Sequence, residues 1–136
     1  MEDAKLLKQV IYANPHLSVL KLSYNALGDE GAAIIASALQ LPNGEHHGHL
    51  SVLDLGFNSI GDKGCEAVAV HGLAGNYNLQ TLYLSGNNIG ETGALSIAGA
   101  ILHGSALLNL YLSANKLGPI GMKAIAGAIA KNDALV

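Results

Sequence analysis

A single motif recurs four times along this chain and constrains its fold more than any other feature. Each copy reads Leu-x-x-Leu-x-Leu-x-x-Asn-x-Leu/Ile-Gly-x-x-Gly, and successive copies start 33, 29 and 28 residues apart. Self-similarity at such a period indicates stacked units that share one continuous core. The copies are LSVLKLSYNALGDEG from Leu17, LSVLDLGFNSIGDKG from Leu50, LQTLYLSGNNIGETG from Leu79 and LLNLYLSANKLGPIG from Leu107.

Each position of the motif has a physical task. Alternating leucines, such as Leu53 and Leu55, predict a short strand with one buried face. The asparagine that follows can satisfy backbone donors and acceptors where the chain turns away. A glycine permits the turn, an acidic residue or proline suits the start of a helix, and an alanine-rich helix follows. We expect the closest contacts between layers at the second glycine of each motif, namely Gly31, Gly64, Gly93 and Gly121.

The alternation of strand and helix at this short period predicts an α/β fold. We expect a right-handed solenoid with parallel strands on its concave face and α-helices on its convex face. The coils resemble leucine-rich repeats of the ribonuclease-inhibitor-like class, and similar repeats occur in Ran GTPase-activating proteins and NOD-like receptors. The resemblance covers the chain from about Leu17 onward and implies a leucine-rich-repeat protein.

The repeats predict one solenoid domain. Its four repeats occupy residues 17–49, 50–78, 79–106 and 107–134, with an inserted loop at 41–49 in the first. Residues 1–16 are expected to form the helix of a preceding or capping repeat, and residues 135–136 match the start of a fifth. The apolar stripe of that first helix is predicted from Leu6, Leu7, Val10 and Ile11. Because no polar capping repeat is evident, we expect a fragment of a longer array, or ends covered by further repeats or neighbouring subunits.

The charged residues exclude several functions. All seven basic residues are lysines, so the chain has no planar guanidinium for bidentate phosphate recognition. A basic patch of the kind that binds nucleic acid is not evident, and no nucleic-acid partner is expected. No membrane span is expected either, because the apolar stretch 94–112 contains His103 and Asn109 and follows the repeat pattern.

Nothing in the sequence meets the requirements for catalysis, and we expect no catalytic residue and no cofactor. A phosphate-binding loop motif is absent. The single cysteine, Cys65, occupies the position of Ala32, Ala94 and Met122 in the other repeats, which predicts a buried packing role. Without a possible internal disulfide or a secretory signal, the chain is expected to be intracellular, most simply cytoplasmic.

The candidate site lies at the outward-facing strand positions of the concave face. Its middle column is Lys21, Asp54, Tyr83 and Tyr111. Since neighbouring strands lie about 4.8 Å apart, Lys21 can pair with Asp54 and the two tyrosines can stack. Exposed tyrosines are favoured at interface hot spots, although ordinary packing between neighbours on a sheet surface explains them equally well. The predicted partner-binding residues also include Thr81 and Asn109, while Tyr24 and Phe57 either continue this surface or cover the coil edge.

The inserted loop contains a group of histidines. His46, His47 and His49, with Glu45, are possible metal ligands, but a structural zinc site needs four fixed ligands and a supporting shell. We therefore expect a solvated loop without a metal, which could still touch a partner protein.

These observations favour a non-catalytic scaffold that binds another protein through the concave sheet face. One alternative is a structural subunit or joint within a large assembly, consistent with the uncapped ends. A second alternative is part of a small-GTPase-activating protein, implied by the resemblance to Ran GTPase-activating proteins. The lack of arginine removes an arginine finger from this chain and counts against that alternative.

Overall fold

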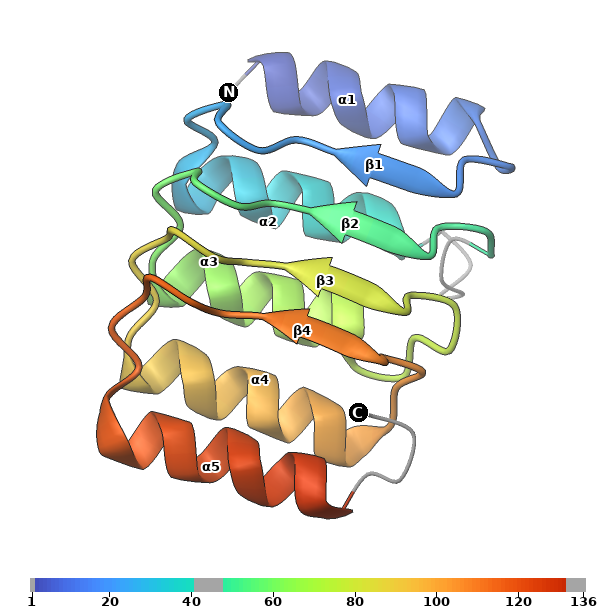
Figure 1. Ribbon diagram of the computed structural model, residues 1–136. Coiled ribbons are helices and arrows are strands. Elements are labelled where there is room, and N and C mark those ends of the chain that lie inside the picture. The colour runs from blue at the N-terminus through green and yellow to red at the C-terminus, as the bar shows by residue number, and fades with distance from the viewer. Residues whose placement is uncertain (1, 41–47, 132–136) are drawn as a thin grey trace.

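The computed structural model describes residues 2–40 and 48–131. Its strands lie side by side in one layer, and the helices form a second layer behind them (Figure 1). The strands are β1 (Val19–Lys21), β2 (Val52–Asp54), β3 (Thr81–Tyr83) and β4 (Asn109–Tyr111). The helices are α1 (Glu2–Ala13), α2 (Gly28–Leu39), α3 (Asp62–Ala67), the π-helix η1 (Val68–Leu73), α4 (Glu91–His103) and α5 (Gly118–Lys131).

The strands form one parallel sheet in the order β1-β2-β3-β4, and equivalent motif positions pair in register. Identical motif positions therefore form columns across the sheet. Leucines of the inward columns, such as Leu53 and Leu82, have no exposed surface and pack between the sheet and the helices. The predicted α/β leucine-rich-repeat solenoid is confirmed.

The repeated asparagine of the motif joins later coils to the coil before them. The side-chain oxygen of Asn58 accepts hydrogen bonds from the backbone N–H groups of Asn25 (2.8 Å) and Leu27 (3.3 Å). Its side-chain amide donates to the carbonyls of Leu22 (2.9 Å) and Gly56 (3.0 Å). Asn58 is completely buried, so these bonds satisfy groups that water cannot reach. Bonds of the same kind link the later coils through Asn87 and Asn115.

The acidic residue after the first motif glycine also links neighbouring coils. Asp29 Oδ1 accepts hydrogen bonds from the backbone N–H groups of Gly61 (2.7 Å) and Gly64 (3.0 Å), which belong to the following repeat. Asp62 bonds Gly90 and Gly93 in the same way. The sequence pattern predicted an acid at the start of its own helix. The structure shows that the hydrogen bonds of this carboxylate go to amides at the start of the next helix.

The second motif glycine lies in close contact with the preceding coil, whereas the sequence predicted its closest contact between the strand and helix layers. A Cβ added at Gly93 would lie 2.8 Å from Ile89 Cγ2 and 2.9 Å from Asp62 Oδ1. A Cβ at Gly64 would lie 2.7 Å from Asp29 Oδ1. Real Cβ atoms do not approach other atoms this closely, so a larger residue would force the layers apart.

One repeat contains a local departure from α-helical geometry. Leu73 follows Gly64 by nine positions, whereas the equivalent Ile101 follows Gly93 by eight, yet both side chains are buried. The extra residue is absorbed where α3 continues as the π-helix η1. A π-turn accommodates one inserted residue without ending the helix, so Leu73 still reaches the core.

The predicted apolar stripe of the first helix is only half correct. In α1, Ala4 and Ile11 are buried and Leu7 is partly buried against the core. Leu6 and Val10 are more than half exposed. The buried side of the helix therefore includes Ala4 and Ile11 and excludes Leu6 and Val10.

We predict that Asn58→Ala lowers the free energy of unfolding by about 2–4 kcal/mol, because it leaves several buried backbone groups without partners. Chemical denaturation measures the change. Asn25→Ala is the matched control, since the Asn25 side chain donates to carbonyls of Leu22 and Ser23 in its own turn. A loss at Asn25 as large as that at Asn58 would contradict the assignment of the inter-coil bonds as the stabilising ones.

A second prediction compares two glycines within α4. Gly93→Ala is expected to destabilise by about 1–3 kcal/mol through steric overlap. Gly99→Ala is expected to stabilise by about 0.5–1 kcal/mol through helix propensity, because nothing lies within 4 Å of a Cβ there. Thermal unfolding of both variants tests the pair, and equal effects would refute the close-contact explanation.

Candidate functional site

The sheet places the four residues of the predicted middle column at one register position. Lys21 pairs with Asp54, Asp54 with Tyr83, and Tyr83 with Tyr111 across adjacent strands. Lys21 and Tyr111 are exposed, while Asp54 and Tyr83 are half-buried. These side chains lie on the sheet surface opposite the helices, which we call the strand face.

The two tyrosines stack in parallel. Their ring centroids lie 4.4 Å apart and the planes differ by 6°. Partial desolvation and the neighbouring Tyr111 raise the pKa of the Tyr83 hydroxyl above its ordinary value, and the Asp54 carboxylate raises it further. Tyr83 therefore stays neutral throughout the physiological range, and the pair offers a rigid apolar surface edged by hydroxyl groups.

The predicted ion pair on this face is wrong. Asp54 Oδ1 accepts a hydrogen bond from the backbone N–H of Gly56 at 2.9 Å, and the described residues include no ion pair between Asp54 and Lys21. The turn amide competes successfully because its geometry is fixed, whereas a lysine side chain loses conformational entropy when it is held. Lys21 instead extends into solvent.

The two other predicted residues bond to each other beside the tyrosines. Asn109 Nδ2 donates to Thr81 Oγ1 at 3.3 Å, and on the other side of the tyrosines Ser113 Oγ donates to Ser85 Oγ at 3.0 Å. The tyrosine pair is thus flanked by short polar side chains on both sides. The tyrosine pair therefore forms an apolar centre with polar side chains around it.

A second aromatic pair lies where the chain leaves β1 and β2. Tyr24 and Phe57 stack with centroids 4.7 Å apart and an angle of 4°, and both rings are exposed. A Cβ at Gly86 would lie 2.3 Å from the Phe57 ring, so the ring covers that glycine. Tyr24 and Phe57 have φ values of 61° and 56°, a region that costs energy for residues other than glycine. The sequence named this pair but did not resolve its role, because spacing alone does not show the turn geometry.

The histidine loop is only partly described. His46 and His47 lie outside the described residues. The His49 ring lies 5.0 Å from the His16 ring. Among residues 2–40 and 48–131, no group of three or more potential ligands is arranged to hold a metal ion.

Cys65 lies in the core, as its repeat position predicted. It is fully buried, as are its equivalents Ala32 and Ala94, although the fourth equivalent, Met122, is largely exposed. Burial raises the pKa of the Cys65 thiol to about 12, and the carboxylates of Asp62 and Asp29 add to the shift. A thiol in this state is not a nucleophile at neutral pH.

Within the described part of the chain, no helix has the length and apolar character needed to cross a membrane.

The chain is similar to known leucine-rich-repeat proteins. The leucine-rich-repeat family model matches residues 13–36, 46–69 and 75–98, and the chain belongs to the leucine-rich-repeat family. A mouse relative, "NACHT, LRR and PYD domains-containing protein 9C", is 35% identical over 97 residues. That match covers 71% of this chain but 9% of the relative, so the chain spans under a tenth of its length.

Two solved structures share the fold at low sequence identity. "Leiomodin-1 Actin-Binding Site 2 (ABS2)" has a TM-score of 0.80 and 21% identity, covering 95% of this chain and 73% of that one. The tropomodulin C-terminal domain of Caenorhabditis elegans has a TM-score of 0.72 and 14% identity, covering 94% and 78%. At these identities the likeness concerns the fold.

We predict that folded Cys65 reacts with iodoacetamide about 1,000-fold more slowly at pH 8 than the urea-unfolded chain does, because only the thiolate reacts and the raised pKa lowers its fraction by about that factor. The same shift lowers stability as pH rises. The unfolded thiol loses its proton near its model value of 9.0, while the folded one retains it to about 12. Fast alkylation of the folded protein, followed by mass spectrometry, would refute the buried assignment.

Proposed function

We propose that the chain is a non-catalytic scaffold that binds another protein through its strand face. The observation that carries this proposal is the parallel stack of Tyr83 and Tyr111 on an outward-facing surface that the fold itself does not need. The inward leucines and the buried asparagines already hold the coils together. Large rigid aromatic side chains outside that core are the residues that dominate binding energies at protein interfaces.

The second aromatic pair extends this proposed surface. Tyr24 and Phe57 lie three residues after the ends of β1 and β2, and Tyr83 and Tyr111 are the last residues of β3 and β4. We include both pairs in the proposed contact, with Asp54, Thr81 and Asn109 as its polar members and Lys21 at its edge. The actin-binding site 2 of leiomodin-1 has a similar fold, which supports a protein as the class of partner here.

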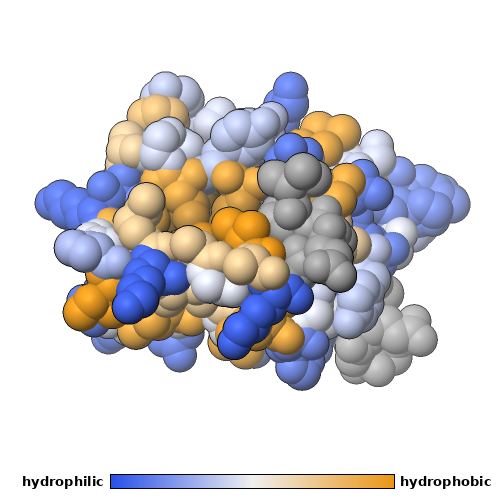
Figure 2. All heavy atoms as spheres, turned by 60° about the horizontal axis from the view of Figure 1, so that its bottom comes forward, coloured by the Kyte–Doolittle hydropathy of each residue, from blue (hydrophilic) through white to orange (hydrophobic). Residues whose placement is uncertain are grey.

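A structural joint is the second candidate, and one observation favours it. A groove of about 320 Å³ lies at the end of the stack beside β4 and α5. In Figure 2, which brings this end of the molecule forward, apolar side chains gather on it. The groove is lined by Leu112, Ser113, Leu117, Met122, Ile125, Ala126 and Ile129. An apolar surface of this kind suits a neighbouring coil or subunit.

We predict that the double variant Tyr83→Ala/Tyr111→Ala weakens partner binding by more than about 2 kcal/mol while the coil remains folded. The partner is first captured from native extract, and its contact is mapped by cross-linking and hydrogen exchange. Tyr77→Ala is the matched control, because Tyr77 is an exposed tyrosine outside the strand face.

Two results would redirect the proposal. Unchanged affinity in a folded double variant would remove the tyrosines from the interface. Protection confined to α1 and to the groove beside β4 and α5, with none along the strands, would favour the structural joint.

A further inference from the structure

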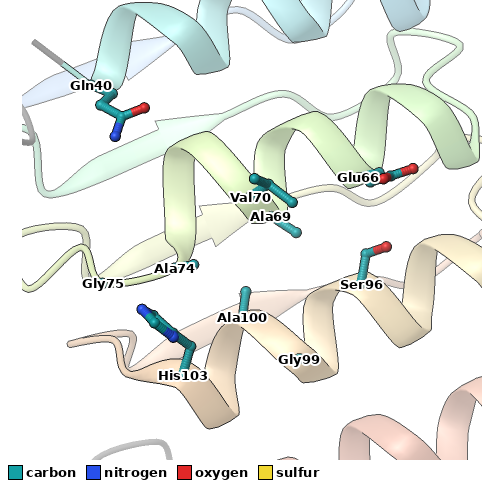
Figure 3. Close-up of a pocket in the computed structure, with 10 residues that line it drawn as sticks. All are labelled: Gln40, Glu66, Ala69, Val70, Ala74, Gly75, Ser96, Gly99, Ala100 and His103. Carbon is teal, nitrogen blue, oxygen red and sulfur yellow. The ribbon is translucent and has the colours of Figure 1, made fainter. Parts of the chain in front are cut away.

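The outer surface of α4 has an apolar stripe with a gap in its middle. Leu95, Gly99 and Leu102 follow each other at helical spacing, and the two leucines are 46% and 55% exposed. A groove of about 640 Å³ separates this stripe from α3 and η1 (Figure 3), and a second groove of about 560 Å³ separates it from α5. Gly99 lines both grooves, so the absence of a side chain there opens a continuous surface across three helices.

The glycines of this surface have no function in the chain's own packing. A Cβ at Gly93 would collide with neighbouring atoms, but a Cβ at Gly99 or at Gly127 of α5 would meet nothing within 4 Å. A glycine inside a helix lowers helix stability relative to alanine. Internal packing therefore does not explain Gly99 and Gly127, whereas close approach of another molecule does.

The helices on either side of α4 carry side chains of opposite charge at equivalent positions of the repeat. Glu66 lies two residues after Gly64 in α3, and Lys123 lies two residues after Gly121 in α5. Both side chains are exposed and both line the grooves that flank α4. One turn further along, Val70 and Gly127 occupy a second pair of matching positions, six residues after the same two glycines.

We propose that this surface docks a second copy of the chain, with a twofold axis running parallel to α4. Such an axis places α4 against α4 of the second copy and α3 against its α5, all in parallel. Leu95, Gly99 and Leu102 then meet their own counterparts. Glu66 faces Lys123 of the second copy, and Val70 faces its Gly127, where the missing side chain leaves room. The surface is thus self-complementary in shape and charge, as an isologous dimer interface must be.

The curvature of the solenoid limits the size of this contact. Because the helix face is convex, the copies touch most closely along α4, and the flanking helices meet mainly through the long side chains of Glu66 and Lys123. Because the contact is small, we expect a dissociation constant in the micromolar range. The strand face remains free in this dimer, so the inference stands or falls independently of the proposed function.

Sedimentation equilibrium of the purified chain, from about 5 µM to 500 µM, tests the proposal. We expect a reversible monomer–dimer equilibrium, and a monomer throughout this range would overturn it. Gly99→Gln supplies the diagnostic variant. It is expected to raise the melting temperature, because it removes a helix-interior glycine, and to weaken dimerisation at least about tenfold, because its side chain fills the contact. Dimerisation unaffected by Gly99→Gln would also overturn the proposal.

The charge pairing is tested by exchange. Glu66→Lys and Lys123→Glu are each expected to weaken the dimer about five- to tenfold by placing like charges opposite one another. The double variant restores the opposite pairing and should recover wild-type dimerisation. Lys5→Glu, an exposed change on α1 outside the surface, is the control and should have no effect. Failure of the double variant to recover would refute this orientation of the two copies.

Discussion

The buried amide of the repeated asparagine is the interaction on which the rest of the structure depends. Strands of three residues contribute few ladder hydrogen bonds, and a coil must also turn out of the sheet with its backbone groups satisfied. Asn58 accomplishes this by accepting from two backbone amides of the preceding coil and donating to one carbonyl of that coil, Leu22, and to one of its own, Gly56. Each buried group left unpaired around Asn58 would cost about 1–3 kcal/mol. The spacing of the coils, and hence the alignment of the surface columns, follows from this bond.

The sequence was informative wherever a single repeat determines the answer. Alternating leucines predicted each strand, and strand pairing in register brought Tyr83 and Tyr111 together as expected. It was less informative where neighbouring repeats compete for the same group. Asp54 was expected to pair with Lys21 but bonds the amide of Gly56. Asp29 was expected at its own helix start, yet it also caps the next helix. The pattern identifies the donors and acceptors, and only the three-dimensional packing determines the partners.

The sequence also did not predict the rotation of α1 or the π-helix η1, for a related reason. Periodicity marks an apolar stripe without fixing the rotation of the helix, so Leu6 and Val10 were predicted on the buried side of α1 although both are exposed. The extra residue between Gly64 and Leu73 is visible in the spacing of the repeats. However, an insertion in a loop would have produced the same spacing. The extra residue is accommodated in the π-helix η1, which keeps Leu73 in the core.

Within each coil, the motif residues stabilise the fold and the residues between them do not. Binding residues are therefore expected at positions that vary among the repeats. The leucines of the motif form the core, the asparagine satisfies the turn, and the glycine permits the close contact. Replacing any of them would lower the free energy of unfolding. The side chains between them carry none of those tasks. On the strand face these are the stacked tyrosines, and on the helix face they are Leu95 and the glycine at 99, which no internal packing requires. Because the two faces lie on opposite sides of the same layers, a partner bound to the strands and a second copy bound to α4 would not compete. A solenoid with one strand layer and one helix layer can thus hold two different contacts without altering the bonds that keep its coils in register.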